Sequence, residues 1–297
     1  MSDFPSVSKE QKHYLKALKR NLRLIQIARI LLLFLFLGLW EFTARFGIID
    51  SFIFSSPSQI LKKMVEMLQD GSLTGHIAIT LTETLVSFFL VTVLGIAIAV
   101  LLWAFPRLSA VLEPYLVVLN SLPKSALAPL LIVWLGSNMK TIILAGISVA
   151  IFGAILNLYT GFCETDPDKL KLIRTLGGTK KDALFKVVLP ASVPLILSIM
   201  KVNIGLSLIG IVIGEMIGSK QGLGYLIIYS SQIFQLTTMI MAIVILCVIA
   251  ILLYGNSNCF QKDRLSSSIF IGNKRGLFIA QIPIKSLITG RQFPGKA

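Results

Sequence analysis

The chain has 297 residues, of which 55% are hydrophobic and only 14% are charged, and its mean hydropathy is +0.82. Soluble globular proteins carry about 25% charged residues, so the composition excludes an ordinary soluble domain and indicates an integral membrane protein. The three cysteines and two histidines are scattered without metal-ligand spacing. Neither a disulfide framework nor a metal site is therefore predicted.

Six stretches are apolar and long enough to cross a bilayer, which takes about 20 residues per helix. They are residues 25–46, 77–103, 109–135, 138–161, 191–217 and 234–254. The third stretch contains Pro123 and Pro129, and we expect it to be kinked or broken. The predicted fold is all-α, with six transmembrane helices.

The net charge of +14 is explained by where the basic residues lie. Of the 28 Lys and Arg residues, 21 lie in the N-terminal segment, in alternate loops and in the C-terminal segment, whereas five lie in the opposite loops. Positively charged loops stay in the cytoplasm, so both termini are predicted to be cytoplasmic. This topology removes the reason to invoke nucleic-acid binding.

A short helix is predicted over residues 56–70, on the outer side. Ser56 is the expected N-cap, Pro57 fits the first turn, and Gln59 is expected to complete a capping box. The apolar residues recur at helical spacing, which is typical of a helix lying along the membrane. They are Ile60, Leu61, Met64, Val65 and Leu68.

The longest cytoplasmic loop, residues 164–190, has the pattern of two short helices joined by a glycine turn. Asp166 and Pro167 begin the first helix, and Gly177 follows its end. Thr179 and Asp182 form a second capping box, which starts a helix expected to reach Pro190. Leu170, Ile173 and Leu176 form the apolar stripe of the first helix. A projecting knob and a plain solvated connector both fit this pattern.

The string LIRTLGGTKKDALFKVVLPASVP resembles the cytoplasmic loop of ABC importer permeases that is called the EAA motif. Gly177 takes the place of the motif's glycine, and Leu189 and Pro190 take the place of its Leu-Pro. Lys171, Leu172 and Ile173 stand where Glu-Ala-Ala is typical, which calls into question a salt bridge by that glutamate.

The resemblance extends from about residue 50 to Tyr254. The strings FSSPSQIL, LPKSALAPLLIVWLG, ILNLYTGFCETDPDKL and GEMIGSKQGLGYLI occur in the expected order. Together they resemble the nitrate, sulfonate, taurine and thiamine-precursor branch of binding-protein-dependent permeases.

The resemblance implies a type I ABC importer permease in the bacterial cell (inner) membrane. It implies a second copy of the chain, a partner ATPase that binds ATP and Mg²⁺, and an extracytoplasmic solute-binding protein. The chain itself is expected to bind no cofactor and to have no catalytic residues, and it lacks a GxxxxGK[ST] phosphate loop. The expected solute is a sulfonate, nitrate or taurine-like anion, or a pyrimidine precursor.

The resemblance also places residues that couple the permease to its ATPase. In the family, the loop helix docks in a groove of the ATPase, so that closure of the nucleotide sandwich moves the spans. The residues that this implies are Asp166, Leu170, Ile173, Leu176 and Gly177. Replacing Gly177 by a bulky residue is predicted to uncouple transport while leaving folding mostly intact.

Polar residues inside the spans are candidates for the translocation pathway, because they are costly there and are often functional. They are Glu83, Asn120, Lys124, Asn157, Lys201, Asn203 and Glu215. The two lysines could attract an anionic solute; alternatively they pair with the two glutamates, or cap carbonyls freed by Pro123. The asparagines could instead bond between helices.

Small residues recur every fourth position in span five, at Gly210, Gly214 and Gly218. Such spacing permits close helix contact. It fits packing either within one subunit or between two.

The expected organisation has five parts. They are a basic cytoplasmic N-terminus (1–24), the first transmembrane helix (25–46), an external segment with an amphipathic helix (47–71), the transmembrane domain (72–254) and an atypical basic cytoplasmic tail (255–297). A frameshift near codon 255 is an alternative origin of the tail. A self-contained channel or ion-coupled secondary transporter is the alternative function, and a membrane enzyme is disfavoured because no catalytic constellation is present.

Overall fold

The computed structural model describes residues 9–273, which are helical and contain no strand. The helices are α1 Lys9–Arg45, α2 Ser51–Phe54, α3 Pro57–Gln69, α4 Ser72–Ala104, α5 Pro106–Ser121, α6 Lys124–Leu135, α7 Met139–Cys163, α8 Pro167–Thr175, α9 Lys180–Ala183, the π-helical turn η1 Leu184–Val188, α10 Leu189–Gly218, α11 Leu223–Gln232 and α12 Leu236–Asn273. The predicted all-α fold is confirmed.

The centre of the bundle is formed by α4, α7 and α10, with α7 packed along both of the others. All three helices are apolar around most of their circumference, which is typical of helices buried in a bundle or in lipid. Their main core includes Val91 of α4, Phe162 of α7 and Val188 at the end of η1, each completely buried. A second core joins α3, α11 and α12 around Leu223 and Met241.

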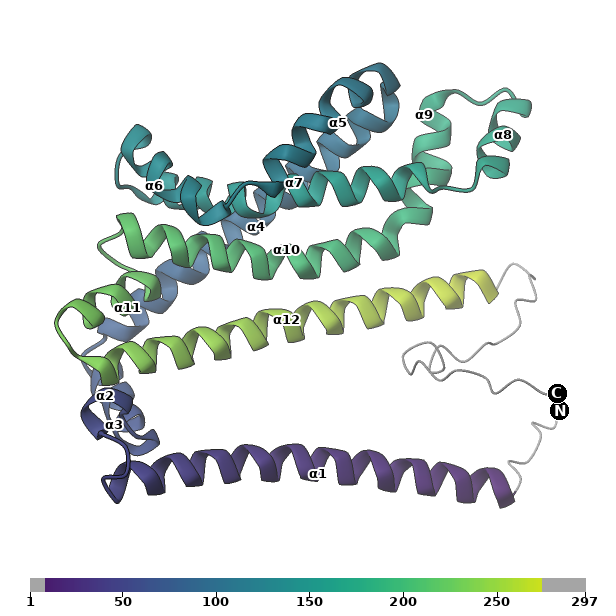
Figure 1. Cartoon of the computed structure of the whole chain (residues 1–297). Coiled ribbons are helices and arrows are strands. Elements are labelled where there is room, and N and C mark those ends of the chain that lie inside the picture. The colour runs from purple at the N-terminus through teal and green to yellow at the C-terminus, as the bar shows by residue number, and fades with distance from the viewer. Residues whose placement is uncertain (1–8, 274–297) are drawn as a thin grey trace, which may run out of the picture.

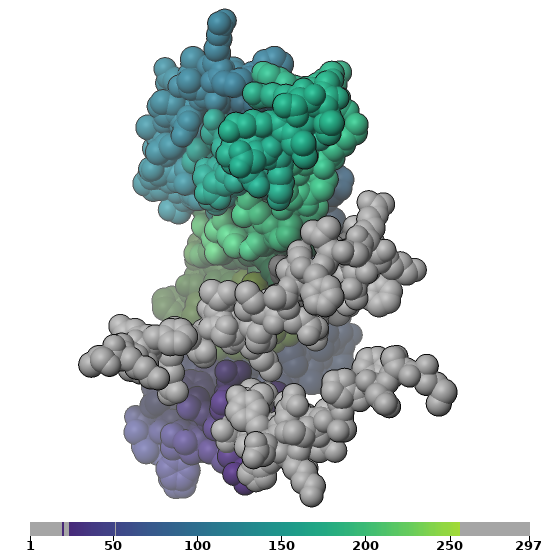
Figure 2. All heavy atoms as spheres, turned by 90° about the vertical axis from the view of Figure 1, so that its right-hand side faces the viewer, coloured from purple at the N-terminus to yellow at the C-terminus, as the bar shows by residue number. Residues whose placement is uncertain are grey.

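The helices extend between two ends of the molecule (Figure 1). One end carries α2, α3 and α11, and we call it the α3 end. The other carries α8 and α9, and we call it the α8 end. Helix α1 begins, and α12 ends, toward the α8 end. Figure 2 looks onto the α8 end, where the knob formed by α8 and α9 faces the viewer together with α5.

The predicted spans are confirmed with changes at their boundaries. Five helical segments of the described residues are long and apolar enough to cross a membrane, and the pair α5–α6 makes a sixth if it is counted as one span. This pair is bent by 95°, as its prolines predicted. Leu122 is extended because the following residue is Pro123, and a residue before proline is pushed out of helical conformation.

The second helix of the 164–190 loop does not end at Pro190. Helix α9 continues through η1 into α10, so that residues 180–218 form one apolar helical segment. Within η1 the Leu189 N–H donates to the carbonyl of Leu184, five residues earlier. The wider π turn comes directly before Pro190, which lies at the start of α10 and has no N–H to donate to the preceding turn. One unbroken helical segment therefore joins the knob to the α3 end, and it changes direction sharply between α9 and α10 (Figure 1).

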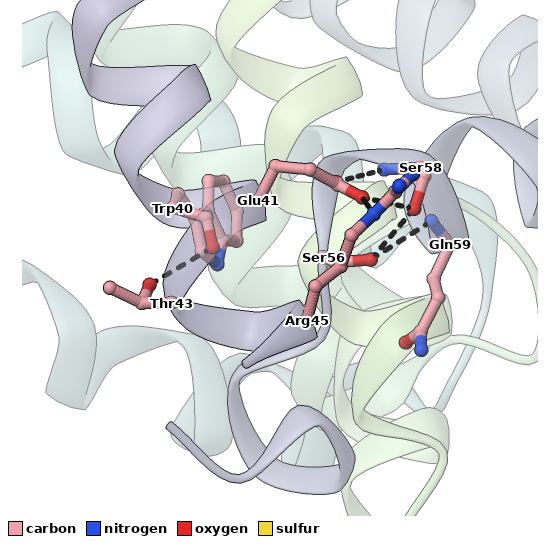
Figure 3. A network of polar contacts seen from close by, with 7 residues as sticks. All are labelled: Trp40, Glu41, Thr43, Arg45, Ser56, Ser58 and Gln59. Carbon is pink, nitrogen blue, oxygen red and sulfur yellow. Dashed lines mark hydrogen bonds and ion pairs between the residues drawn. The ribbon is translucent and has the colours of Figure 1, made fainter. Parts of the chain in front are cut away.

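Helix α1 is attached to α3 by a polar network (Figure 3). The Glu41 carboxylate accepts bonds from the backbone N–H of Ser58 at 3.0 Å and from its hydroxyl at 2.9 Å, and Arg45 donates to the same carboxylate at 2.6 Å. A carboxylate at a helix N-terminus is favoured by the helix dipole. The apolar window of α1 has no buried residue, so this network is a principal link between α1 and the bundle.

The amphipathic helix expected over residues 56–70 is α3, and Ser56 is its N-cap. Its side chain accepts the N–H of Gln59 at 3.3 Å. The predicted capping box is not formed, because the Gln59 side chain accepts a bond from the Ser55 hydroxyl. Another free N–H of this terminus, that of Ser58, is bonded by Glu41 of α1, which lies too far away in sequence for a local motif to reveal.

The expected N-terminal and C-terminal parts are only partly described. Helix α1 already begins at Lys9, inside the expected segment 1–24, and α12 continues to Asn273, inside the expected tail. Residues 1–8 and 274–297 lie outside the described part of the chain. The origin of the tail therefore stays a prediction.

Candidate functional site

The knob at the α8 end is built by local signals that the sequence predicted. Asp166 caps α8 by accepting the Asp168 N–H at 2.9 Å. At the other end of α8, the N–H of Gly177 donates to the Arg174 carbonyl and the N–H of Gly178 to the Ile173 carbonyl. This pair of bonds is a Schellman motif, and it requires a left-handed residue, which Gly177 supplies with φ +78°.

The start of α9 is fixed in the same way. The Thr179 hydroxyl and the Asp182 carboxylate form the predicted capping box. Lys186 adds an ion pair to Asp182 at 2.7 Å. Both helices of the knob are therefore capped at the turn that joins them, which gives the knob a defined shape.

The apolar stripe of α8 is divided between the base of the knob and its surface. Leu170 packs on the main core, and Ile173 lies half-buried against Gly178. Leu176 is 75% exposed, and Leu172, which sequence analysis did not include, is 58% exposed. One helical turn separates these two leucines, so they share a face. The exposed apolar surface of the knob is thus Leu172 and Leu176.

Near the α3 end, two carboxyl groups meet inside the bundle. Glu83 of α4 and Glu215 of α10 are 1% and 0% exposed, and their carboxyl groups are in direct contact. Each comes from a different helix of the central trio, and their positions in sequence gave no sign that they meet.

Glu215 holds the turn between α10 and α11. Its carboxylate accepts the Gly224 N–H at 2.6 Å and the Thr80 hydroxyl at 2.7 Å. Thr80 in turn accepts the Leu223 N–H at 2.8 Å, and His76 Nδ1 accepts the Gly222 N–H at 3.0 Å. Three successive backbone N–H groups at the start of α11 are therefore bonded to side chains of α4 and α10, which satisfies donors that a helix N-terminus leaves free.

The glycines of this turn are required by the close approach of the carboxylate. A Cβ at Gly222 would lie 2.3 Å from the Glu215 carboxyl carbon, and one at Gly224 would lie 2.5 Å from the Val212 carbonyl oxygen. Gly222 also has φ +105°, where L-residues are strained.

The two lysines take different positions from those that a glutamate pairing would need. Lys201 is half-buried on α10, about 21 Å along that helix from Glu215. Lys124 is half-buried at the first residue of α6, just after the bend. The ion pairs found between described residues include neither Glu83 nor Glu215. Lys201 therefore lies too far along α10 to pair with Glu215, and the other expected roles of the two lysines stay predictions.

The three asparagines are separated by burial. Asn203 is 3% exposed on α10, and Asn157 is exposed on α7. The Asn120 Oδ1 is buried at the end of α5 without a hydrogen-bond partner, and it lies 3.3 Å from the position of a Cβ on Gly153.

The glycine stripe of α10 packs inside the subunit. A Cβ on Gly210 would lie 2.7 Å from the Cα of Gly146 on α7, and a Cβ on Gly214 would lie 3.2 Å from Ile142. Gly218 faces Ile132 of α6. Of the two expected arrangements, packing within one subunit is the one found.

Within residues 9–273, no cluster of three or more His, Cys, Asp or Glu side chains could hold a metal ion.

The links made by Thr80, His76 and Glu41 were missed by sequence analysis because each joins elements distant in the chain. Leu172 was missed because a helix as short as α8 does not tell which of its apolar residues face outward.

Comparison with known proteins places these features in a family. Residues 91–258 match the family described as "Binding-protein-dependent transport system inner membrane component". The chain is 32% identical to a probable ABC transporter permease protein of Haemophilus influenzae, over 76% of this chain and 91% of that protein. It is 28% identical to a putative aliphatic sulfonates transport permease protein of Bacillus subtilis, over 72% and 77% of the two chains.

The fold is similar to that of a solved transporter. The chain superposes on a chain of the MetNI methionine ABC transporter, in an inward-facing conformation, with a TM-score of 0.59 and 20% identity. The match covers 66% of this chain and 97% of that chain. This likeness concerns the fold.

Proposed function

Because the chain belongs to the family of binding-protein-dependent transport system inner membrane components and is an ABC importer permease, we propose that it carries a small solute delivered by a binding protein. The solute is a sulfonate, nitrate or taurine-like anion, or a pyrimidine precursor. A sulfonate is supported by the name of the Bacillus subtilis relative. The chain is a transport subunit and not an enzyme, and the energy comes from ATP and Mg²⁺ bound by a separate ATPase.

The α8 end is the cytoplasmic side in this proposal. Most Lys and Arg residues lie in segments of this end or in the two terminal segments, and basic segments stay in the cytoplasm. The start of α1 and the end of α12 lie toward the same side, which agrees with both termini being cytoplasmic. The α3 end then faces the binding protein.

The observation that carries the proposal is the exposed pair Leu172 and Leu176 on a capped, projecting helix. An apolar pair on a rigid support suits a groove of a partner protein better than water, because its burial would be favourable. Leu170 and the unbroken helical segment from α9 through η1 to α10 tie the same knob to the core. Movement of the docked knob would therefore be passed to α10, as alternating access requires.

A second copy of the chain completes the permease in this proposal. Apolar side chains on α5 and α6 are strongly exposed, with Tyr115 65%, Val133 81% and Trp134 70% exposed. These side chains suit lipid or a second subunit. Asn120 and Lys124, on either side of the bend between α5 and α6, are then placed to contribute to a pathway at or near the subunit contact, and Asn157, Lys201 and Asn203 stay candidates for the same pathway.

The experiment is capture of the partner ABC ATPase by the detergent-solubilised full chain. Leu172→Asp and Leu176→Asp are each expected to weaken capture by about tenfold or more, because a charge enters an apolar contact. Arg174→Asp is the matched control, since it puts the same carboxylate on the opposite face of α8.

The outcomes distinguish an ABC importer permease from a channel or secondary transporter. Capture by the wild type and by Arg174→Asp, with loss in both leucine variants, supports the permease and its docking face together. If the folded wild type captures no ATPase and nevertheless carries solute in proteoliposomes without ATP, the chain is a secondary transporter or channel and the proposal fails.

A further inference from the structure

A groove of about 460 Å³ lies between α4 and α7, beside the last residue of α6. Its apolar lining consists of Val86 and Leu90 of α4, Leu135 of α6, and Ile143, Leu144 and Ile147 of α7. Val86, Leu135 and Leu144 are exposed, so the groove opens on the surface of the bundle. Both α4 and α7 are long and apolar enough to span a membrane. The apolar part of the groove therefore lies at the depth of the hydrocarbon tails of the bilayer.

The rim of the groove carries a positive charge. Lys140 lines the groove and is the second residue of α7. It is exposed, and the ion pairs between described residues do not include it. Because the apolar span begins here, its ammonium group lies at the level of the lipid headgroups, where long basic side chains are favoured. Among the described residues that line the groove there is no Asp or Glu, so the groove offers this charge no counter-ion.

Other features of the rim also favour an anion. The N-terminus of α7 lies here, and a helix N-terminus attracts negative charge. The Asn138 side chain is occupied, because it accepts the Thr141 N–H at 3.0 Å and donates to the Leu135 carbonyl at 3.0 Å. Thr141 also lines the groove, and its buried hydroxyl has no hydrogen-bond partner. Lys220 lines an adjoining pocket that shares Asn138 with the groove, and it adds a second positive charge.

The two parts of the groove together define the chemistry of its ligand. A positive charge at headgroup level above an apolar channel matches a phospholipid whose headgroup is negatively charged. A zwitterionic headgroup would bring its own ammonium group close to Lys140, and no acidic side chain of the groove could receive it. Lipid tails are as apolar as leucine, so the tail gains little by leaving the bilayer. Selectivity therefore has to come from the headgroup.

We propose that the groove between α4 and α7 binds one anionic phospholipid of the leaflet at the α3 end, with its phosphate on Lys140 and one acyl chain along Leu90, Leu144 and Ile147. The inference depends on α4 and α7 as membrane spans, and it does not depend on the solute or on the ATPase. It gives the permease a lipid ligand that occupies the surface between two of its three central helices.

The test is native mass spectrometry of the delipidated full chain, titrated separately with phosphatidylglycerol and with phosphatidylcholine of the same acyl chains. The wild type is expected to retain about fivefold more phosphatidylglycerol, which is the factor that one basic side chain near a lipid surface supplies. Lys140→Gln should lower this retention to the level of phosphatidylcholine. Lys62→Gln, at an exposed lysine of α3, is the control and should retain lipid as the wild type does.

A second pair of variants tests the apolar part of the groove. Leu144→Trp places a large ring in the groove at an exposed position, and it is expected to lose most of the retained phosphatidylglycerol. Val93→Trp, at an exposed position of α4 outside the groove lining, is the matched control and should keep it. The thermal midpoint of each variant in detergent is recorded, and both should match the wild type.

The other possible occupants give different results. The proposal is overturned if the two lipids are retained equally, if Lys140→Gln or Leu144→Trp retains phosphatidylglycerol as the wild type does, or if the folded wild type retains none. Displacement of the lipid by inorganic phosphate at equal concentration would assign the rim to a free anion and would also overturn it. Retention by monomers but not by dimers in the same spectrum would show that a second copy of the chain covers the groove, with the same consequence.

Discussion

At the scale of single residues, Glu215 is a carboxyl group that is 0% exposed in an apolar helix of the bundle, where a polar group is costly. Its position is explained by the N–H of Gly224 and the hydroxyl of Thr80, which donate to its two oxygens. Hydrogen bonds to charged groups contribute about 1.5–3 kcal/mol each. The residue therefore ties α11 to α4 and α10.

Glu215→Gln is expected to destabilise the protein by about 1–3 kcal/mol, because the amide group replaces one acceptor by a donor and leaves a buried partner unsatisfied. The measurement is the thermal midpoint in detergent, together with hydrogen exchange at Gly222–Gly224. Exchange should rise at these amides. Glu113→Gln on exposed α5 should change neither, and equal behaviour of the two variants would refute the tying role.

At Gly177 the backbone conformation, and not space, limits substitution. A Cβ there would meet nothing within 4 Å, but φ is +78°. Gly177→Asn should keep most of the coupled uptake, since asparagine tolerates the left-handed region. Gly177→Val should lose most of it, because a β-branched residue does not tolerate that region.

The measurement for the Gly177 variants is ATP-dependent uptake by the assembled transporter, with the thermal midpoint recorded in parallel. Both variants should be folded, because the residue lies on the knob surface. Uptake by Gly177→Val at the wild-type rate would show that the Schellman turn is not needed for coupling.

Sequence could predict residues whose partners are local, and it failed where partners are distant. Asp166, Gly177 and Thr179 act through neighbours within a few positions, so spacing was sufficient. Glu83 and Glu215 were selected as polar residues inside the spans, but their contact with each other was not predicted. Partner choice among transmembrane helices depends on rotation and depth, which one sequence of apolar residues does not determine.

At the scale of elements, the closest helix contact is between α7 and α10. Gly210 meets Gly146 where the two backbones approach, and no side chain fits between them. Small residues at such crossings permit the van der Waals packing that holds helices together in lipid.

Gly210→Ala is expected to cost about 1–3 kcal/mol, because its Cβ would lie 2.7 Å from the Cα of Gly146. Gly205→Ala on the same helix is the matched control, since its Cβ would meet nothing within 4 Å and alanine is the better helix former. Unfolding in mixed detergent micelles measures both. Equal loss of stability would mean that the close approach carries no energetic weight.

The Glu41 network makes a separate prediction about α1. Glu41→Ala should loosen α1 from α3, because both the N–H and the hydroxyl of Ser58 lose their acceptor. Faster limited proteolysis in the turn after Arg45 is the expected result, with little change in the thermal midpoint of the bundle. Glu66→Ala, an exposed glutamate in the middle of α3, should leave proteolysis unchanged.

Sequence predicted which helices form more reliably than it predicted where one helix continues into the next. Hydropathy located the spans, and Pro123 located the break between α5 and α6. The joining of α9 to α10 was not predicted because proline usually ends a helix or begins one. The π turn η1 changes the helix register just before Pro190, and nothing in the local pattern distinguishes this from a helix end.

At the scale of the whole molecule, one helical segment connects the knob at one end with the Glu215 cluster at the other. Residues 180–218 form this segment; it changes direction sharply between α9 and α10 (Figure 1), and Glu215 lies in its last turn. In the proposed function, this unbroken segment is a physical route from the surface that docks the ATPase to the solute side. The route requires that the two ends lie on opposite sides of the membrane.

Cysteine labelling tests this requirement. In a background with Cys163, Cys247 and Cys259 changed to serine, Lys62→Cys on α3 and Arg174→Cys on α8 place thiols at exposed positions of the two ends. A membrane-impermeant maleimide should label the first in spheroplasts, and the second only after permeabilisation, because the basic segments lie inside. Labelling of both before permeabilisation would place the knob outside, where no ATPase could reach it, and the coupling route would fail.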